Sequence, residues 1–135
     1  MSSGLALTTF ERMIAAQDGD PRVVSDYSLF PTAPGVEVLR ADRKGFVIAM
    51  KAEAIGRASN ALGAGRDKVG DAVDPAVGIV TQVKVGDEVV SGQPLMHLHH
   101  RDGKGLDAAR ALCAGGLTIG DARPAPRVKI LGEVR

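Results

Sequence analysis

The periodicity of the hydrophobic residues changes once along this chain, over 31–35, where two prolines and a glycine interrupt it. Before this point, apolar residues over 5–17 recur at the spacing of an amphipathic helix. After it, valines alternate with polar residues as they do in a strand. We therefore place a domain boundary here, with a helical segment over 1–33 and a second domain over 34–135.

The expected elements follow one another in the order of an α+β fold. Asp20 and Pro21 supply a helix cap and a favoured first helical residue, so a short second helix is predicted there. Gly63 is well placed to end a helix. Gly86 and Gly92 permit tight turns, so we expect the strands on either side of these turns to form small β-hairpins. The further elements that we expect are strands at 36–38, 45–50, 77–85, 95–99 and 128–134, and helices at 54–62 and 106–114.

Charge and aromatic content argue against nucleic-acid and membrane partners. The chain has 17 Lys and Arg residues against 16 Asp and Glu residues, with no long block of one sign. A binder of nucleic acid or of an anionic membrane normally shows a basic patch. The aromatic residues are too few for base stacking along a single strand; they are Phe10, Tyr27, Phe30 and Phe46.

The single cysteine, Cys113, has no partner for an internal disulfide, which is typical of a reducing compartment. We therefore expect a cytoplasmic protein. The N-terminus lacks the apolar core of a secretory leader, because Glu11 and Arg12 interrupt it. No apolar run approaches the roughly 20 residues that a membrane-spanning helix needs.

The segment from Leu62 to Arg66 contains two glycines and an arginine, a composition that also occurs in phosphate-binding loops. Phosphate loops precede a helix and use the positive end of its dipole. This segment instead follows the expected helix over 54–62, where the partial charge is negative. A helix stop followed by a turn is the stronger interpretation.

The histidines are clustered at His97, His99 and His100, and the first two would point to the same side of a strand. Such a pair could contribute to a zinc site, but no third ligand is evident, because Cys113 lies on an apolar helix. Neither Cys113 nor Ser91 has the surroundings of a catalytic nucleophile. The acidic residues fall mostly in turns, where Asp carboxylates commonly bond the local backbone; examples are Asp67, Asp71, Asp74 and Asp87. We therefore assign no catalytic, cofactor-binding or metal-ligating residue.

Lys51 lies in an Ala-Met-Lys-Ala motif that resembles the modified-lysine signature of biotin carrier domains, and the turn over 86–95 resembles the one that precedes this lysine in biotinyl and lipoyl modules. The order is reversed here, because the turn follows Lys51 with a helix between them. A carrier module modified at Lys51 is therefore an alternative, as is a freestanding domain that binds a small ligand. The likeness of the turn also favours a barrel-sandwich-like architecture.

Several blocks along the chain resemble the C-terminal part of thymidine and other pyrimidine nucleoside phosphorylases. The blocks occur in the family's order and cover most of the chain, with Asp18 standing where that family usually has glycine. They are Ala6-Leu7 to Gln17, Gly19-Asp20-Pro21, Gly45-Phe46-Val47, Ala54 to Ala58, Leu62 to Arg66, Val77-Gly78-Ile79, Gly86-Asp87, Gly92, Pro94-Leu95 and His99.

The resemblance implies a hammerhead-like α+β domain that buttresses a larger enzyme. The complete enzyme would cleave thymidine with phosphate as co-substrate, giving thymine and 2-deoxyribose 1-phosphate, and no cofactor is implied. In this family the phosphate loop and the base-binding residues lie in the preceding α and α/β domains. Those domains would be the partners of this chain, joined through the segment 1–33. We expect the chain alone to be inactive and, with an apolar helix face uncovered, to self-associate.

Overall fold

The computed structural model describes residues 4–66, 68–126 and 132, and these fall into two compact units, 1–32 and 33–135. The first unit is helical, with α1 at Leu5–Ala16 and the 3-10 helices η1 at Pro21–Val24 and η2 at Tyr27–Leu29. The predicted cap is confirmed, because the Asp20 carboxylate accepts a 2.9 Å hydrogen bond from the Arg22 backbone N–H. None of its three helices has a buried residue.

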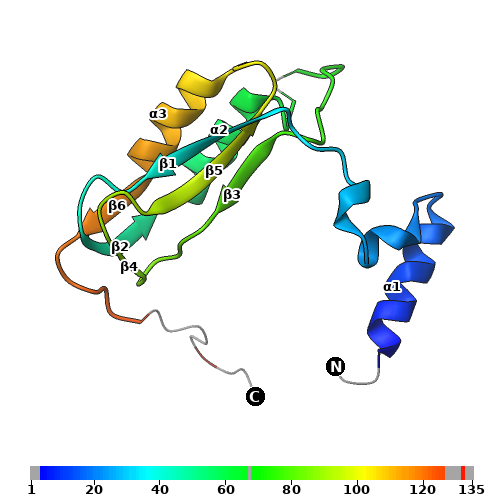
Figure 1. The fold of residues 1–135 in the computed structure, drawn as a ribbon, viewed down its shortest axis with the longest axis horizontal. Helices are drawn as coiled ribbons and strands as arrows, with labels where there is room; N and C mark the ends of the chain where they lie inside the picture. The colour runs from blue at the N-terminus through cyan, green and yellow to red at the C-terminus, as the bar shows by residue number, and fades with distance from the viewer. Residues whose placement is uncertain (1–3, 67, 127–131, 133–135) are drawn as a thin grey trace. The chain divides into compact units, whose positions relative to one another are not determined.

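The second unit combines two three-stranded antiparallel sheets with two helices, which confirms the α+β class (Figure 1). The strand orders are β1-β5-β3 in one sheet and β4-β2-β6 in the other. The elements are β1 (Gly35–Arg40), β2 (Gly45–Met50), α2 (Ala52–Leu62), β3 (Gly78–Thr81), β4 (Glu88–Val89), β5 (Pro94–His100), α3 (Leu106–Gly116) and β6 (Leu117–Gly120).

Helices α2 and α3 lie side by side along the β1-β5-β3 sheet (Figure 1). Their contact forms the core with the central strand β5, where Met96 and Leu98 are fully buried. Ala58 and Leu62 contribute from α2, and Cys113 contributes from α3. The apolar positions of the helices therefore serve the role that their spacing predicts.

The face of the β1-β5-β3 sheet that points away from the helices carries the residues that alternate along β5 with Met96 and Leu98. His99 pairs with Val36 and Gly78, and His97 pairs with Val38 and Val80. Val36 and Val80 are about half exposed, at 48% and 49%. The alternation along β5 therefore places Met96 and Leu98 on the buried face of the strand and His97 and His99 on its outer face.

The structure corrects the expected strand over 77–85 and the expected hairpins. β3 ends at Thr81, and the chain then crosses to the second sheet, where the Gly86 N–H donates a 2.8 Å bond to the Val47 carbonyl. Among the described strands, every pairing joins strands that are not consecutive in the sequence. The turns predicted at Gly86 and Gly92 are present, each with positive φ, but they connect the two sheets instead of closing hairpins.

The end of the last described helix also differs from the sequence interpretation. Gly115 and Gly116 belong to α3 instead of ending it, and an unpredicted strand, β6, follows directly. A Cβ on Gly116 would lie 2.9 Å from the Ala54 Cβ, so this glycine permits close packing of α3 against α2. The strand predicted over 128–134 lies outside the described residues, apart from position 132.

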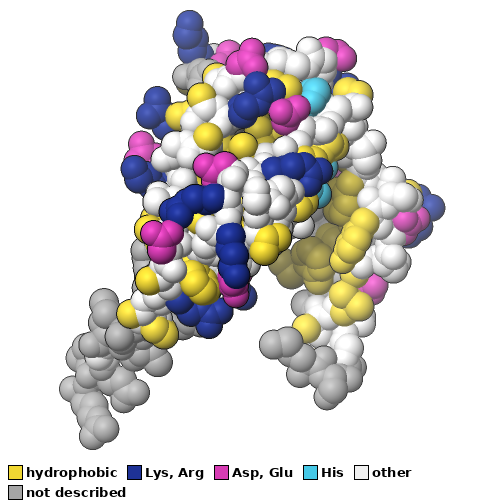
Figure 2. Space-filling view, turned by 60° about the vertical axis from the view of Figure 1, so that its left-hand side comes forward, with side chains coloured by type: hydrophobic (Ala, Val, Ile, Leu, Met, Phe, Trp, Pro, Cys, Tyr) yellow, Lys and Arg dark blue, Asp and Glu magenta, His cyan; other side chains and the backbone are white. Residues whose placement is uncertain are grey.

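Surface charges of both signs are interspersed over the face shown in Figure 2. None of the described helices is long and apolar enough to cross a membrane.

Candidate functional site

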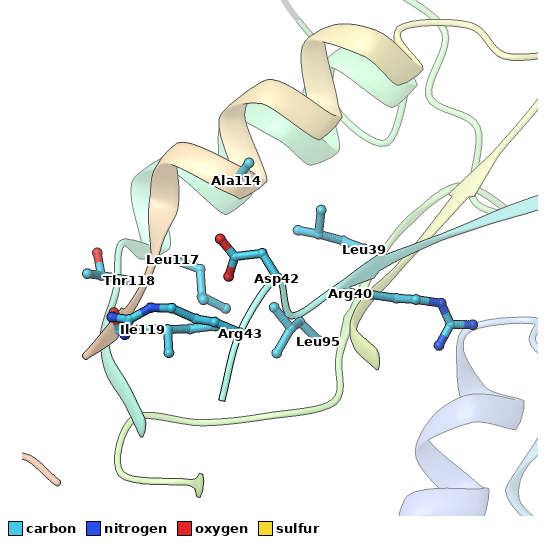
Figure 3. A pocket seen from close by; sticks show the side chains of 9 residues that line it. All are labelled: Leu39, Arg40, Asp42, Arg43, Leu95, Ala114, Leu117, Thr118 and Ile119. Carbon is cyan, nitrogen blue, oxygen red and sulfur yellow. The ribbon is translucent and has the colours of Figure 1, made fainter. Parts of the chain in front are cut away.

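A pocket of about 390 Å³ opens where the two sheets and α3 meet (Figure 3). Five apolar side chains from β1, β5, α3 and β6 form its walls: Leu39, Leu95, Ala114, Leu117 and Ile119. Four polar or charged residues complete the lining: Arg40, Asp42, Arg43 and Thr118. Leu95 is only 3% exposed, so the pocket lies directly over the core.

The two arginines of this pocket are already engaged with other groups. Arg43 donates to a carboxylate oxygen of Asp121 at 2.5 Å and to the Ile119 carbonyl oxygen at 2.5 Å. Arg40 donates to the Gly92 carbonyl oxygen at 3.0 Å, and its side chain points away from the pocket (Figure 3).

The Asp42 side chain points into the pocket between Leu39, Ala114 and Leu117 (Figure 3). Within the described residues, neither its carboxylate nor the Thr118 hydroxyl has a hydrogen-bond or ion-pair partner. Among the residues that line the described pocket, no second carboxylate, histidine, cysteine or lysine accompanies Asp42 as a partner for general acid–base catalysis. The arrangement suits binding better than catalysis.

The glycine segment after α2 is a helix stop, as its position predicts. Gly63 adopts the left-handed conformation, with φ at 103°, as the C-cap of α2. The Gly63 N–H donates to the Asn60 carbonyl at 2.9 Å, and the Ala64 N–H donates to Ser59 at 3.1 Å. These N–H groups are consumed by the helix end and do not point at an anion.

The three histidines do not converge with other ligands. His97 and His99 lie on the outer face of β5, while the His100 Nδ1 accepts a 3.1 Å bond from the Gly103 N–H. In the described part of the chain, no three His, Cys, Asp or Glu side chains are grouped closely enough to hold a metal ion. Cys113 is fully buried in α3, and this burial raises the pKa of its thiol, so the nucleophilic thiolate is disfavoured.

Lys51 and Ser91 occupy structural positions. Lys51 is the exposed N-cap residue of α2, and its backbone N–H donates to the Gly116 carbonyl at 2.8 Å. It lies between β2 and α2, and therefore not in a hairpin turn, which is where carrier domains place the modified lysine. The Ser91 Oγ donates to the Asp42 carbonyl at 3.2 Å and so holds the loop that borders the pocket.

The aspartates predicted to serve turns do so where the structure describes them. Asp74 accepts from the Ala76 N–H at 3.0 Å, and Asp87 accepts from the Lys84 N–H at 3.0 Å. Asp71 accepts from the Lys68 N–H at 2.8 Å. Asp67 lies outside the described residues.

Sequence reasoning did not single out Asp42 or the pocket around it. The only signal was a short charged stretch, Ala41 to Lys44, between two strands. Such a stretch predicts only an ordinary loop, because the pocket also needs residues of α3 and β6 that are distant in the sequence.

Comparison with known proteins agrees with the resemblance of the sequence blocks. A family profile described as the pyrimidine nucleoside phosphorylase C-terminal domain matches residues 46–120. The pyrimidine-nucleoside phosphorylase of Geobacillus stearothermophilus is 42% identical over 99 residues, which are 73% of this chain and 23% of that enzyme. The aligned part therefore spans about a quarter of the length of this relative. The chain belongs to the family of pyrimidine nucleoside phosphorylase C-terminal domains.

Proposed function

We propose that this chain is the supporting C-terminal domain of an enzyme that cleaves thymidine with phosphate, and that the chain alone does not catalyse this reaction. The observation that carries the proposal is the match of the family's C-terminal domain to residues 46–120. The products would be thymine and 2-deoxyribose 1-phosphate. The chain would support the catalytic part of the enzyme without contributing reacting groups.

The chemistry of the reaction supports the non-catalytic role. Cleavage of a nucleoside by phosphate needs several cationic and hydroxyl donors around the phosphate and positive charge near the departing base. The described pocket offers one carboxylate, one hydroxyl and two arginines that are bonded elsewhere. A carboxylate that faces the pocket would repel phosphate.

The helical segment over 1–33 is proposed to join this domain to the preceding α/β domain of the enzyme. Its helices have no buried residue, and Leu7, Phe10 and Met13 of α1 are each more than half exposed. An apolar helix face of this kind normally packs against another element. The proposed setting is the cytoplasm, which is supported by the single cysteine.

The purified chain tests this proposal in an assay with thymidine and phosphate that measures free thymine. We expect no turnover above the uncatalysed background, while the Geobacillus stearothermophilus enzyme in the same buffer serves as the positive control. A parallel assay with uridine covers broader pyrimidine nucleoside use. Turnover of either nucleoside by the chain alone would contradict the non-catalytic role.

A further inference from the structure

We propose that the pocket of Figure 3 binds an alkylammonium group, that is, a protonated primary amine on a compact apolar body. Neither a phosphorolysis reaction nor a purely supporting domain requires such a ligand. The inference rests on the pocket alone, and it holds whether or not the proposed function does.

The charge balance of the pocket selects a cation. Arg43 forms an ion pair with Asp121, and Arg40 points away toward the Gly92 carbonyl. Asp42 is therefore the one charged side chain that points into the pocket without a partner among the described residues. An ammonium group placed there gains a charge-assisted hydrogen bond.

The walls of the pocket select an apolar body for the same ligand. Leu39, Leu95 and Leu117 surround the Asp42 side chain together with Ala114. Asp42 is an exposed residue, so a cation from solution can reach its carboxylate while the apolar walls contact the rest of the ligand. They also bury the carbon stem of a ligand, and a mostly apolar pocket with a few polar groups is the usual form of a small-molecule site.

The backbone of the Asp42 loop is held in place before any ligand arrives. The Ala41 N–H donates to the Gln93 carbonyl at 2.9 Å, and the Ala41 carbonyl accepts from the Gly92 N–H at 2.8 Å. The Ser91 Oγ bonds the Asp42 carbonyl, as described above. These bonds fix the backbone from which the carboxylate projects, so binding costs little ordering of the loop.

The size of the pocket limits the ligand to a small molecule or to one side chain. A volume of about 390 Å³ lies at the lower end of the range for ligand pockets. The same ammonium chemistry is carried by a free alkylamine and by a lysine side chain. The experiment therefore includes both sources.

The test is an NMR titration of the 135-residue chain with isopentylamine and, separately, with Nα-acetyl-lysine methylamide. We expect shifts confined to amides around Asp42, Leu117 and Thr118, with a dissociation constant of about 1 mM for so small a ligand. Saturation by isopentylamine alone would identify a site for free amines, and saturation by both would extend the site to lysine side chains. Failure of both probes to saturate at these amides would overturn the proposal.

Two controls separate the charge from the apolar contact. Isopentanol, the neutral counterpart, should bind at least about tenfold more weakly, because its hydroxyl can still donate to the carboxylate but carries no positive charge to pair with it. Asp42→Asn should lower the affinity for isopentylamine by a similar factor. The matched variant Asp102→Asn, outside the pocket, should bind isopentylamine as the wild type does. Equal binding of isopentanol and isopentylamine would contradict the role of Asp42 without requiring any variant to fold.

Discussion

At the scale of single residues, carboxylates hold the long connection between α2 and β3. Asp74 accepts from the Ala76 N–H and forms an ion pair with Arg101, with 2.6 Å between the Nε and a carboxylate oxygen. The Asp74 N–H in turn donates to the Gly63 carbonyl at the end of α2. Asp74 therefore links the α2–β3 connection to Arg101, which directly follows β5.

The ion pair gives folding stability a pH dependence with a definite sign. The hydrogen bond from Arg101 holds the pKa of Asp74 below its ordinary value, with the Ala76 N–H acting in the same direction. The carboxylate therefore stabilises the fold above the unfolded pKa of about 3.9, and this stability is lost as the pH falls through the lowered pKa. Denaturant unfolding at pH 7, 5, 4 and 3 should show a smaller acid-induced loss for Asp74→Asn than for the wild type.

Removing the partner gives an independent check of this cause. Arg101→Gln should reduce the same acid-dependent part of the stability, because the pKa of Asp74 then returns toward its ordinary value. An acid dependence in Asp74→Asn as steep as that of the wild type would show that other carboxylates carry it.

At the scale of elements, the close approach of α2 and α3 depends on a glycine at the start of α3. Gly105 is the N-cap of α3, with φ at 65°, and a Cβ there would lie 1.9 Å from the Ala61 carbonyl oxygen. Gly105 thus combines a left-handed backbone with direct contact to α2. Two separate physical reasons favour glycine at this position.

Gly105→Ala should therefore destabilise the fold more than a left-handed backbone alone would explain. We expect a loss of about 2–4 kcal/mol, the sum of left-handed strain and forced separation of the helices. Gly103→Ala is the matched control, because Gly103 also has positive φ but has open space around its Cβ position. Its expected loss is about 1 kcal/mol, and equal losses for the two variants in urea unfolding would refute the contact with α2.

The sequence predicts the elements of this fold better than their pairing. The helices and β5 are recognisable because apolar spacing and glycine stops are local signals. The antiparallel partners of β5 are β1 and β3, and this choice depends on contacts between distant segments that no local pattern contains. β6 was missed because Gly115 and Gly116 read as a helix end and loop, whereas they allow α3 to pack closely and run directly into the strand.

The pocket could not be predicted for the same reason. Asp42 meets Leu117 and Ala114 only because β6 and α3 fold back beside the loop after β1. Asp42 precedes both residues by more than 70 positions in the sequence, so no local pattern relates them. The family's blocks, in contrast, could be recognised from the sequence because they recur in order along it.

At the scale of the whole molecule, the helical segment over 1–33 exposes apolar side chains, and none of its three described helices has a buried residue. Leu7, Phe10 and Met13 of α1 are 52%, 53% and 54% exposed. If the proposed α/β domain normally covers them, the separate chain has a cause to associate with itself.

Sedimentation velocity of the isolated chain should therefore show reversible association that depends on α1. We expect Phe10→Ser combined with Met13→Ser to weaken the association at least about tenfold, because each apolar side chain contributes through burial. Val36→Ser combined with Val80→Ser, on the outer face of the β1-β5-β3 sheet, is the control and should leave it unchanged. If the chain stays monomeric at every concentration, the apolar face of α1 does not mediate self-association.

The most direct measurement of the central claim is the activity of a chimera. In it, the 99 aligned residues of the Geobacillus stearothermophilus phosphorylase are replaced by the matching residues of this chain. Because we expect this domain to supply support and not reacting groups, the chimera should cleave thymidine with phosphate, although this chain alone should not. A folded chimera without activity, or turnover by the isolated chain, would contradict the account.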